Sequence, residues 1–165
     1  MRRPAPDPVG PGQESVWSYP RPPRVERSAR EVVVVVGGVA VCRTRRALRV
    51  LETSHPPTWY LPREDWAAGA LRPAPGSSSC EFEGLAAYLD VVGGSRVERA
   101  AAWTYPDPSP GFEALRDAVA VYPARTDRCT VDGEVVRPQG GGFYGGWVTS
   151  DVVGPFKGAP GSAGW

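Results

Sequence analysis

The sequence predicts a single α+β domain that is mostly β, with a curved antiparallel sheet or partial barrel built from hairpins and one main short helix. The length of 165 residues allows one hydrophobic core of ordinary size. Hydrophobic residues make up 41% of the chain and charged residues 22%, which are values typical of globular proteins. Twenty glycines and nineteen prolines predict many turns, as a chain of hairpins requires.

Composition divides the chain into three parts. Residues 1–14 are predicted to be a flexible, proline-rich arm, because they carry few aliphatic side chains to bury. Residues 15–137 form the predicted β-rich core domain. Residues 138–165 form a glycine-rich extension, and its five aromatic side chains predict that it packs on the core.

Three hairpins are predicted where two runs of strand-forming residues flank a glycine turn. The first is the run of five valines at Val32–Val36, followed by two glycines and a second apolar run. The second joins a long strand over residues 80–92 to a strand over residues 97–105 through Gly93-Gly94-Ser95. The third is Val131–Val135, which contains an Asp-Gly turn.

The remaining predicted elements are shorter. Residues 45–52 have an apolar spacing that fits a short helix or a twisted strand, and residues 58–61 are rich in strand formers. One turn of helix is expected at residues 63–66, and a loop at residues 73–79. The main helix is predicted within residues 112–122, whose apolar side chains repeat at helical spacing.

The charge balance argues against nucleic-acid and membrane partners. Nineteen basic and eighteen acidic side chains leave a formal charge of +1, which is too little to attract a phosphate backbone or anionic lipid. No apolar run approaches the ~18 residues that span a bilayer, so we expect a cytoplasmic protein with its three cysteines reduced. Every basic residue except Lys157 is arginine, which together with abundant alanine, glycine and proline is typical of a GC-rich bacterial genome.

Five segments carry a resemblance to a known family: Arg46–Pro62 (RALRVLETSHPPTWYLP), Ala101–Pro108, Val131–Glu134, Gly141–Trp147 and Gly154–Gly158. Together they resemble the family catalogued as domain of unknown function 427, also labelled nucleotidyltransferase-like, in the branch with a glycine-rich, aromatic C-terminal extension. The resemblance covers residues 14–165 and implies a small, mostly β domain with a short helix, and almost nothing about chemistry. The family commonly has lysine where this chain has Glu83, so the charge is reversed at that position.

His55 is the only histidine, so any imidazole chemistry near neutral pH depends on it. Glu52 lies three residues earlier, and a turn between them places both side chains on one side as a candidate acid/base pair. The alternative is structural: Glu52 caps a turn or forms a salt bridge, and His55 satisfies backbone groups at the Pro56-Pro57 bend. The sequence leaves both interpretations open.

Other reactive groups fit known site patterns less well. Cys80 is a candidate nucleophile if His55 takes its proton, although a cysteine on a strand is more often a small buried hydrophobe. We expect no metal, because one histidine and three scattered cysteines lack the spacing of a zinc site. Glu81 and Glu83 have the spacing of a nucleotidyltransferase carboxylate pair, but no Gly-Ser loop precedes them, so that label is not adopted. The glycine loop at residues 140–146 lacks the lysine of a phosphate-binding loop.

Aromatic side chains beside small residues predict a sheet-lined small-molecule pocket, although an ordinary core explains them equally well. The predicted substrate-binding residues are Arg49 (as an anion partner), Tyr60, Cys80, Trp103, Tyr105, Tyr144 and Trp147, with Glu52 and His55 as the catalytic or orienting pair. The predicted function is a small-molecule binding protein or an enzyme without a cofactor, with acid/base or cyclase/isomerase-like chemistry. The alternative is a non-catalytic protein-interaction module that uses the proline-rich arm and the aromatic tail.

Overall fold

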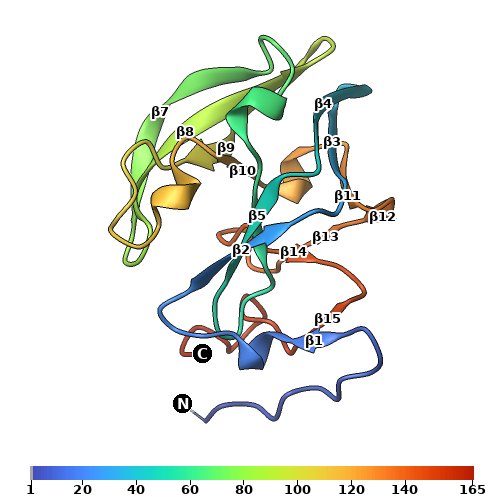
Figure 1. The fold of residues 1–165 in the computed structure, drawn as a ribbon, viewed down its shortest axis with the longest axis vertical. Helices are drawn as coiled ribbons and strands as arrows, with labels where there is room; N and C mark the ends of the chain where they lie inside the picture. The colour runs from blue at the N-terminus through green and yellow to red at the C-terminus, as the bar shows by residue number, and fades with distance from the viewer. Residues whose placement is uncertain (1) are drawn as a thin grey trace.

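Antiparallel β-sheets make up most of the structure, a computed structural model that describes residues 2–165 (Figure 1). The strands are β1 (Glu14–Ser15), β2 (Arg24–Ser28), β3 (Val32–Val36), β4 (Val39–Thr44), β5 (Ala47–Leu51), β6 (Thr58–Tyr60), β7 (Leu71–Cys80), β8 (Gly84–Gly93), β9 (Arg96–Thr104), β10 (Val119–Val121), β11 (Arg128–Val131), β12 (Glu134–Val135), β13 (Arg137–Pro138), β14 (Trp147–Val148) and β15 (Val152–Val153). The helical elements of the described chain are four three-residue 3-10 turns: η1 (Val16–Ser18), η2 (Arg63–Asp65), η3 (Glu113–Leu115) and η4 (Pro123–Arg125). The mostly β prediction is therefore confirmed, and its main helix is absent from residues 2–165.

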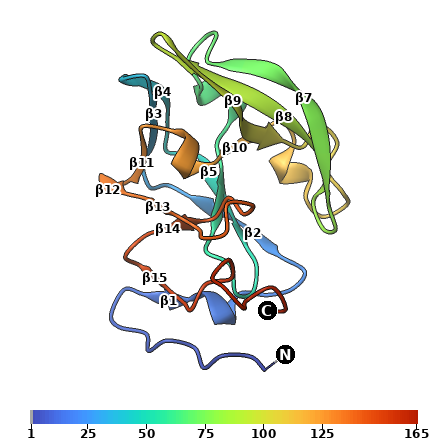
Figure 2. The same ribbon diagram turned by 180° about the vertical axis from the view of Figure 1, so that it is seen from behind.

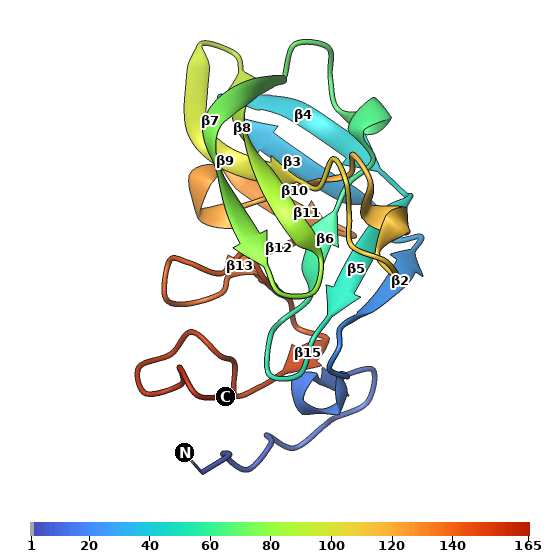
Figure 3. The same ribbon diagram turned by 90° about the vertical axis from the view of Figure 1, so that its left-hand side faces the viewer.

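The strands form three larger sheets and two short pairs. One four-stranded sheet has the order β10-β9-β8-β7, a second has the order β12-β11-β3-β4, and a three-stranded sheet has the order β2-β5-β6. None of these sheets closes on itself within the described residues, so no barrel is formed. Figure 3 shows β7 and β8 in front of β3 and β4, with β5 and β6 to one side, and β8 is in contact with both β3 and β4.

The three predicted hairpins are confirmed: β3 pairs with β4, β8 with β9, and β11 with β12. The glycine turns of the first two also pack against each other. A Cβ atom placed on Gly93 would lie 2.1 Å from the carbonyl oxygen of Val36, and one placed on Gly37 would lie 2.0 Å from the carbonyl oxygen of Gly93. Only glycine fits this contact, so the two glycine turns pack the two four-stranded sheets together as well as ending their strands.

The segment before the second hairpin differs from the prediction. The expected loop at residues 73–79 belongs to strand β7, and the expected long strand over residues 80–92 is interrupted by a turn at residues 81–83. Strands β7 and β8 pair with an irregularity between Pro73 and Ser77, which leaves Pro75 outside the regular ladder, whereas Pro73 pairs with Leu89. Prolines are tolerated in β7 because it is an edge strand.

The predicted helix at residues 112–122 is wrong. Only the turn η3 forms, Asp117 then adopts a positive φ of 60°, and the chain enters β10. Val119 exchanges two backbone hydrogen bonds with Leu61, each 2.8 Å long, so its amide is not available to a helical carbonyl. The apolar side chains whose spacing suggested a helix pack in the core instead.

Residues 45–52, predicted as either a short helix or a twisted strand, contain strand β5 and no helix.

The C-terminal segment contributes directly to the main core. Trp147 is fully buried and stacks on Trp59 with ring centroids 5.8 Å apart. Its indole nitrogen donates to the carbonyl oxygen of Val121 at 3.2 Å, and its backbone amide donates to the carbonyl oxygen of Pro57 at 2.8 Å.

The two ends of the described chain lie together at one end of the molecule (Figure 2). Strand β1 pairs in parallel with β15, and the indole nitrogen of Trp17 donates to the carbonyl oxygen of Pro155 at 2.9 Å. The rings of Trp17 and Trp165 meet edge to face at 5.6 Å. Within residues 2–165, no helix has the length and hydropathy of a membrane span.

Candidate functional site

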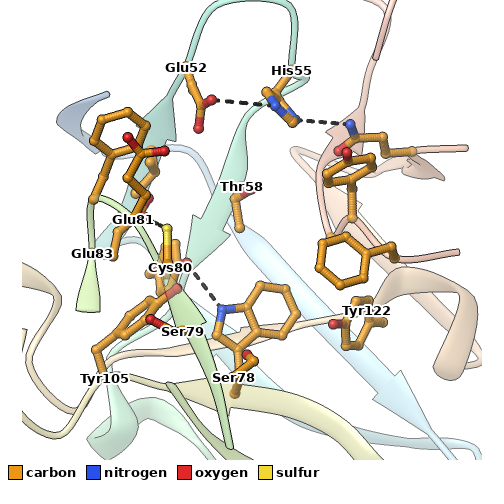
Figure 4. Close-up of a pocket in the computed structure, with 18 of the residues that line it drawn as sticks. Glu52, His55, Thr58, Ser78, Ser79, Cys80, Glu81, Glu83, Tyr105 and Tyr122 are labelled. Atoms are coloured by element: carbon orange, nitrogen blue, oxygen red, sulfur yellow. Dashed lines mark hydrogen bonds and ion pairs between the residues drawn. The ribbon is translucent and has the colours of Figure 1, made fainter. Parts of the chain in front are cut away.

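A cavity of about 410 Å³ lies where several segments distant in sequence meet. Its walls are the loop between β5 and β6, the turn between β7 and β8, the strands β8 and β9, and the C-terminal loop around residues 139–145. The lining residues are Val50, Glu52, His55, Thr58, Tyr60, Ser78, Ser79, Cys80, Glu81, Phe82, Glu83, Tyr88, Trp103, Tyr105, Tyr122, Gln139, Phe143, Tyr144, Gly145 and Lys157. Figure 4 shows Glu52 and His55 at one end of this space and Tyr105 and Ser78 at the other.

The cavity brings together seven of the predicted site residues: Glu52, His55, Tyr60, Cys80, Trp103, Tyr105 and Tyr144. The sequence hypothesis placed Glu52 and His55 in one cavity with Trp103 and Tyr105, and the geometry agrees with that placement.

Arg49 does not line this cavity. Its Nη1 atom donates to Glu14 Oε1 at 2.7 Å and its Nη2 atom donates to Glu26 Oε1 at 2.5 Å. Only 9% of its side chain is exposed. Its anionic partners are therefore carboxylates of the same chain, which tie β1 and β2 to β5, and the expected anion-binding role is replaced by a structural one. These ion pairs could not be predicted from the sequence, because Glu14 and Glu26 are distant from Arg49 along the chain.

Trp147 does not line the cavity either. Its burial against Trp59 places it in the main core, next to the loop that forms part of the cavity wall.

The loop that follows Gln139 in the cavity wall requires glycine at two positions. A Cβ atom on Gly145 would lie 2.1 Å from the Trp103 ring, and one on Gly146 would lie 2.5 Å from the side-chain oxygen of Gln139. The backbone thus passes close over Trp103, as only glycine permits.

His55 is held by a tight turn that follows β5. The amide of His55 donates to the carbonyl oxygen of Glu52 at 3.0 Å, and Ser54 between them has a positive φ of 73°. The Nε2 atom of His55 lies 3.5 Å from Glu52 Oε2, and the same carboxylate oxygen accepts from Arg21 Nε at 3.0 Å. The salt-bridge alternative for Glu52 therefore holds geometrically together with the Glu52–His55 pairing.

Gln139 fixes the other side of the imidazole. Its side-chain oxygen accepts from the amide of Gly146 at 3.1 Å, which identifies its nitrogen as the atom near His55 Nδ1, also at 3.1 Å. That nitrogen also donates to the carbonyl oxygen of Lys157 at 2.7 Å. An amide nitrogen only donates, so Nδ1 is the acceptor and the proton of neutral His55 is on Nε2, facing Glu52. Both ring nitrogens therefore have protein partners.

We expect His55 to titrate below its ordinary pKa of 6.5, because burial lowers the pKa more than the Glu52 carboxylate raises it. Replacing Glu52 with glutamine removes the raising charge, so the pKa of His55 should fall further in that variant. The measurement is a ¹⁵N NMR titration, which is unambiguous with a single histidine. Glu64→Gln is the matched control, since Glu64 is exposed and pairs with Arg46. An unchanged or higher histidine pKa in Glu52→Gln would contradict the pairing.

A second carboxyl group, Glu83, lies in the wall formed by the turn between β7 and β8. Glu83 is only 5% exposed, and its carboxyl group is hydrogen-bonded to the thiol of Cys80 (Figure 4). Burial raises the pKa of Glu83, and the nearby negative charge of Glu52 raises it further. Burial together with this hydrogen bond raises the pKa of the Cys80 thiol to about 11, so Cys80 is a neutral thiol rather than an activated nucleophile.

Aromatic rings form the floor of the cavity. Tyr60 lies with its ring centroid 6.3 Å from that of Trp103 and 6.1 Å from that of Tyr105. The indole nitrogen of Trp103 donates to the hydroxyl of Tyr60 at 3.2 Å, and burial raises the pKa of both tyrosines. These hydroxyls are therefore protonated and neutral at physiological pH.

The comparison with known families agrees with the sequence resemblance. Residues 24–132 match the family described as domain of unknown function (DUF427), labelled NTP_transf_9. The chain belongs to this family. The match spans β2 to β11 and so contains Glu52 and Glu83, whereas Gln139 and the loop over Trp103 lie beyond it. No curated protein matches the chain.

The transferase label of the DUF427 family is not supported by the carboxylates of this chain. Glu81 and Glu83 have the right spacing, but Glu81 is exposed and Glu83 is buried against Cys80, so they do not form a paired metal site. More generally, residues 2–165 contain no cluster of three or more histidine, cysteine, aspartate or glutamate side chains placed to hold a metal ion.

Proposed function

We propose that the protein binds a small molecule in this cavity and that Glu52 and Glu83 act on it as an acid/base pair, with His55 orienting Glu52. The observation that carries the proposal is that Glu52 and Glu83, from separate segments, line one cavity in unlike surroundings. Glu52 is paired with Arg21, whereas Glu83 is buried beside a thiol. Carboxyl groups whose surroundings separate their proton affinities are the usual basis of acid/base catalysis.

The surroundings suggest a role for each group. Glu52, held by Arg21, is suited to accept a proton from the ligand. Glu83 is suited to donate one, because burial raises its pKa. His55 has both ring nitrogens engaged, by Gln139 and Glu52, so it is suited to orient the base rather than to exchange protons itself. The supported reaction class is proton transfer on a small bound molecule.

The alternative of a protein-interaction module has weaker support. It depends on an aromatic surface presented by the C-terminal segment. Of the five aromatic side chains in residues 138–165, only Phe143 is largely exposed, at 75%. A single exposed ring does not make the contiguous apolar patch expected of a docking surface.

The proposal predicts that small fragments bind in the cavity. Saturation-transfer NMR on the full chain would use a mixture of small amines, carboxylic acids and neutral aromatic compounds. We expect one or more to bind and to compete for a single site, because the volume of about 410 Å³ is within the range of ligand pockets. Thr58→Trp should abolish this binding by filling the middle of the cavity, where Figure 4 places Thr58.

Thr130→Trp is the matched control, since Thr130 is a half-buried strand residue outside the cavity lining. Circular dichroism would verify that both variants fold. Absence of any bound fragment, or fragment binding that survives in Thr58→Trp, would contradict the proposed function.

A further inference from the structure

Glu83 is a buried carboxyl group without a cation. It is 5% exposed, and no arginine, lysine or histidine of residues 2–165 lies within ion-pair distance of it. Its side-chain hydrogen bond is with a thiol, which is a weak donor. Glutamate is rarely buried to this degree unless it is paired, because the loss of hydration is costly for its charged form.

The other two carboxylates that line the cavity differ from Glu83, because Glu81 is exposed to water and Glu52 is paired with a cation. Glu52 is paired with Arg21 at 3.0 Å, and Arg21 also donates to the carbonyl oxygen of Thr53. Lys157, the one lysine, donates from Nζ to the oxygen of Trp165 at 3.2 Å and lies 5.8 Å from the centre of the Tyr144 ring. These two cations are thus engaged within the protein, and Glu83 is the buried carboxyl group of the cavity whose counterion is missing.

Aromatic rings line the same cavity as Glu83. Tyr60, Trp103 and Tyr105 line the same cavity, are each at most 8% exposed, and carry neutral side chains. The negative face of an aromatic ring attracts a cation within about 6 Å of its centre, most strongly where water is excluded. A carboxyl group combined with such rings is the arrangement that recognises amines and ammonium groups.

We propose that the ligand of this cavity is an organic cation, with an amine or ammonium group beside Glu83 and a small apolar body against the rings of Tyr60, Trp103 and Tyr105. This inference depends on the proposed function, since it names the class of ligand for the same site. The ammonium group supplies the counterion that Glu83 lacks: an amine that enters unprotonated takes the proton of Glu83, and the carboxylate that remains is then paired with the cation. The volume of about 410 Å³ limits the ligand to a small molecule, such as one aromatic ring with a short side chain.

The test uses three probes of one size and different charge: benzylammonium, benzyl alcohol and benzoate. Isothermal titration calorimetry on the full chain at pH 7.5 should give the tightest binding for benzylammonium, about tenfold tighter than benzyl alcohol, with benzoate weakest. Glu83→Gln keeps the size of the side chain and removes its charge. In that variant the preference for benzylammonium should disappear while the affinity for benzyl alcohol is retained.

Glu64→Gln is the matched control, because it removes an exposed carboxylate outside the cavity lining and should leave the preference unchanged. The inference is overturned if benzoate or benzyl alcohol binds as tightly as benzylammonium, or if Glu83→Gln leaves the preference intact. It is also overturned if none of the three binds at millimolar concentration. Binding of benzyl alcohol or benzoate that is at least as tight as that of benzylammonium, and that Thr58→Trp abolishes, would overturn the cation inference alone and leave the proposed function standing.

Discussion

Trp147→Ala is expected to lower the free energy of unfolding by about 3–5 kcal/mol, the usual cost of truncating a buried tryptophan. Trp147 is fully buried and stacks on Trp59. The substitution also leaves the carbonyl oxygen of Val121 without its indole donor. For a chain of this length, each kcal/mol corresponds to about 2–4 °C, so the melting temperature should fall by about 6–20 °C.

Phe143→Ala provides the control within the same segment. Phe143 is 75% exposed, and exposed substitutions usually change stability by no more than about 0.5 kcal/mol. Thermal and urea unfolding monitored by tryptophan fluorescence and circular dichroism would compare the two variants. Equal stability of Trp147→Ala and the parent chain would show that residues 138–165 are dispensable for the core.

Hairpins were predictable from the sequence because their signals are local. The glycine pairs after Val36 and before Ser95, and the Asp-Gly turn at residues 132–133, specify the reversals by backbone conformation alone, including positive φ at Gly37, Gly38, Gly94 and Gly133. The conformation of these turns is determined by adjacent residues, and contacts with distant parts of the chain do not change it. The contact between the two double-glycine turns is not visible in the sequence, since it depends on how the sheets pack.

The elements that were predicted wrongly depend on distant partners. The apolar repeat of residues 112–122 fits a helix locally, but Leu61 supplies backbone hydrogen bonds that draw Val119 into a strand. The proline-rich residues 73–79 have low strand propensity, yet they pair with β8 at the sheet edge. In both cases tertiary hydrogen bonding decides between local alternatives of similar free energy.

In the candidate site, too, contacts between residues close in sequence were predictable and contacts between distant residues were not. Glu52 and His55 were paired correctly because they are three residues apart, and a single turn brings them together. Gln139 was missed, although it sets the tautomer of His55, because 84 residues separate the two. Glu83 was singled out for its reversed charge relative to the DUF427 family, but its burial follows from the turn between β7 and β8, which the sequence had suggested was continuous strand.

Glu83→Gln is expected to stabilise the unliganded protein above neutral pH and to leave its stability nearly unchanged at pH 4. Burial raises the pKa of Glu83 above its ordinary value of 4.5. At a pH between the ordinary pKa of the unfolded chain and the raised pKa of the folded protein, the folded protein keeps a proton that the unfolded chain has released. The free energy of unfolding therefore falls as the pH rises through this range. Glutamine is uncharged at every pH and does not contribute this loss.

The measurement is the melting temperature of the parent chain and of Glu83→Gln from pH 4 to pH 8. The difference should be near zero at pH 4, where glutamate is protonated in both states, and should grow in favour of the variant as the pH rises to 8. Glu81→Gln should show no such growth, because Glu81 is exposed in the same turn. A constant difference across the range would mean that Glu83 is hydrated or paired in solution, and the missing counterion on which the cation site depends would then not be missing. A growing difference that benzylammonium reverses, by stabilising the parent chain more than the variant at pH 8, would connect the buried carboxyl group directly to ligand charge.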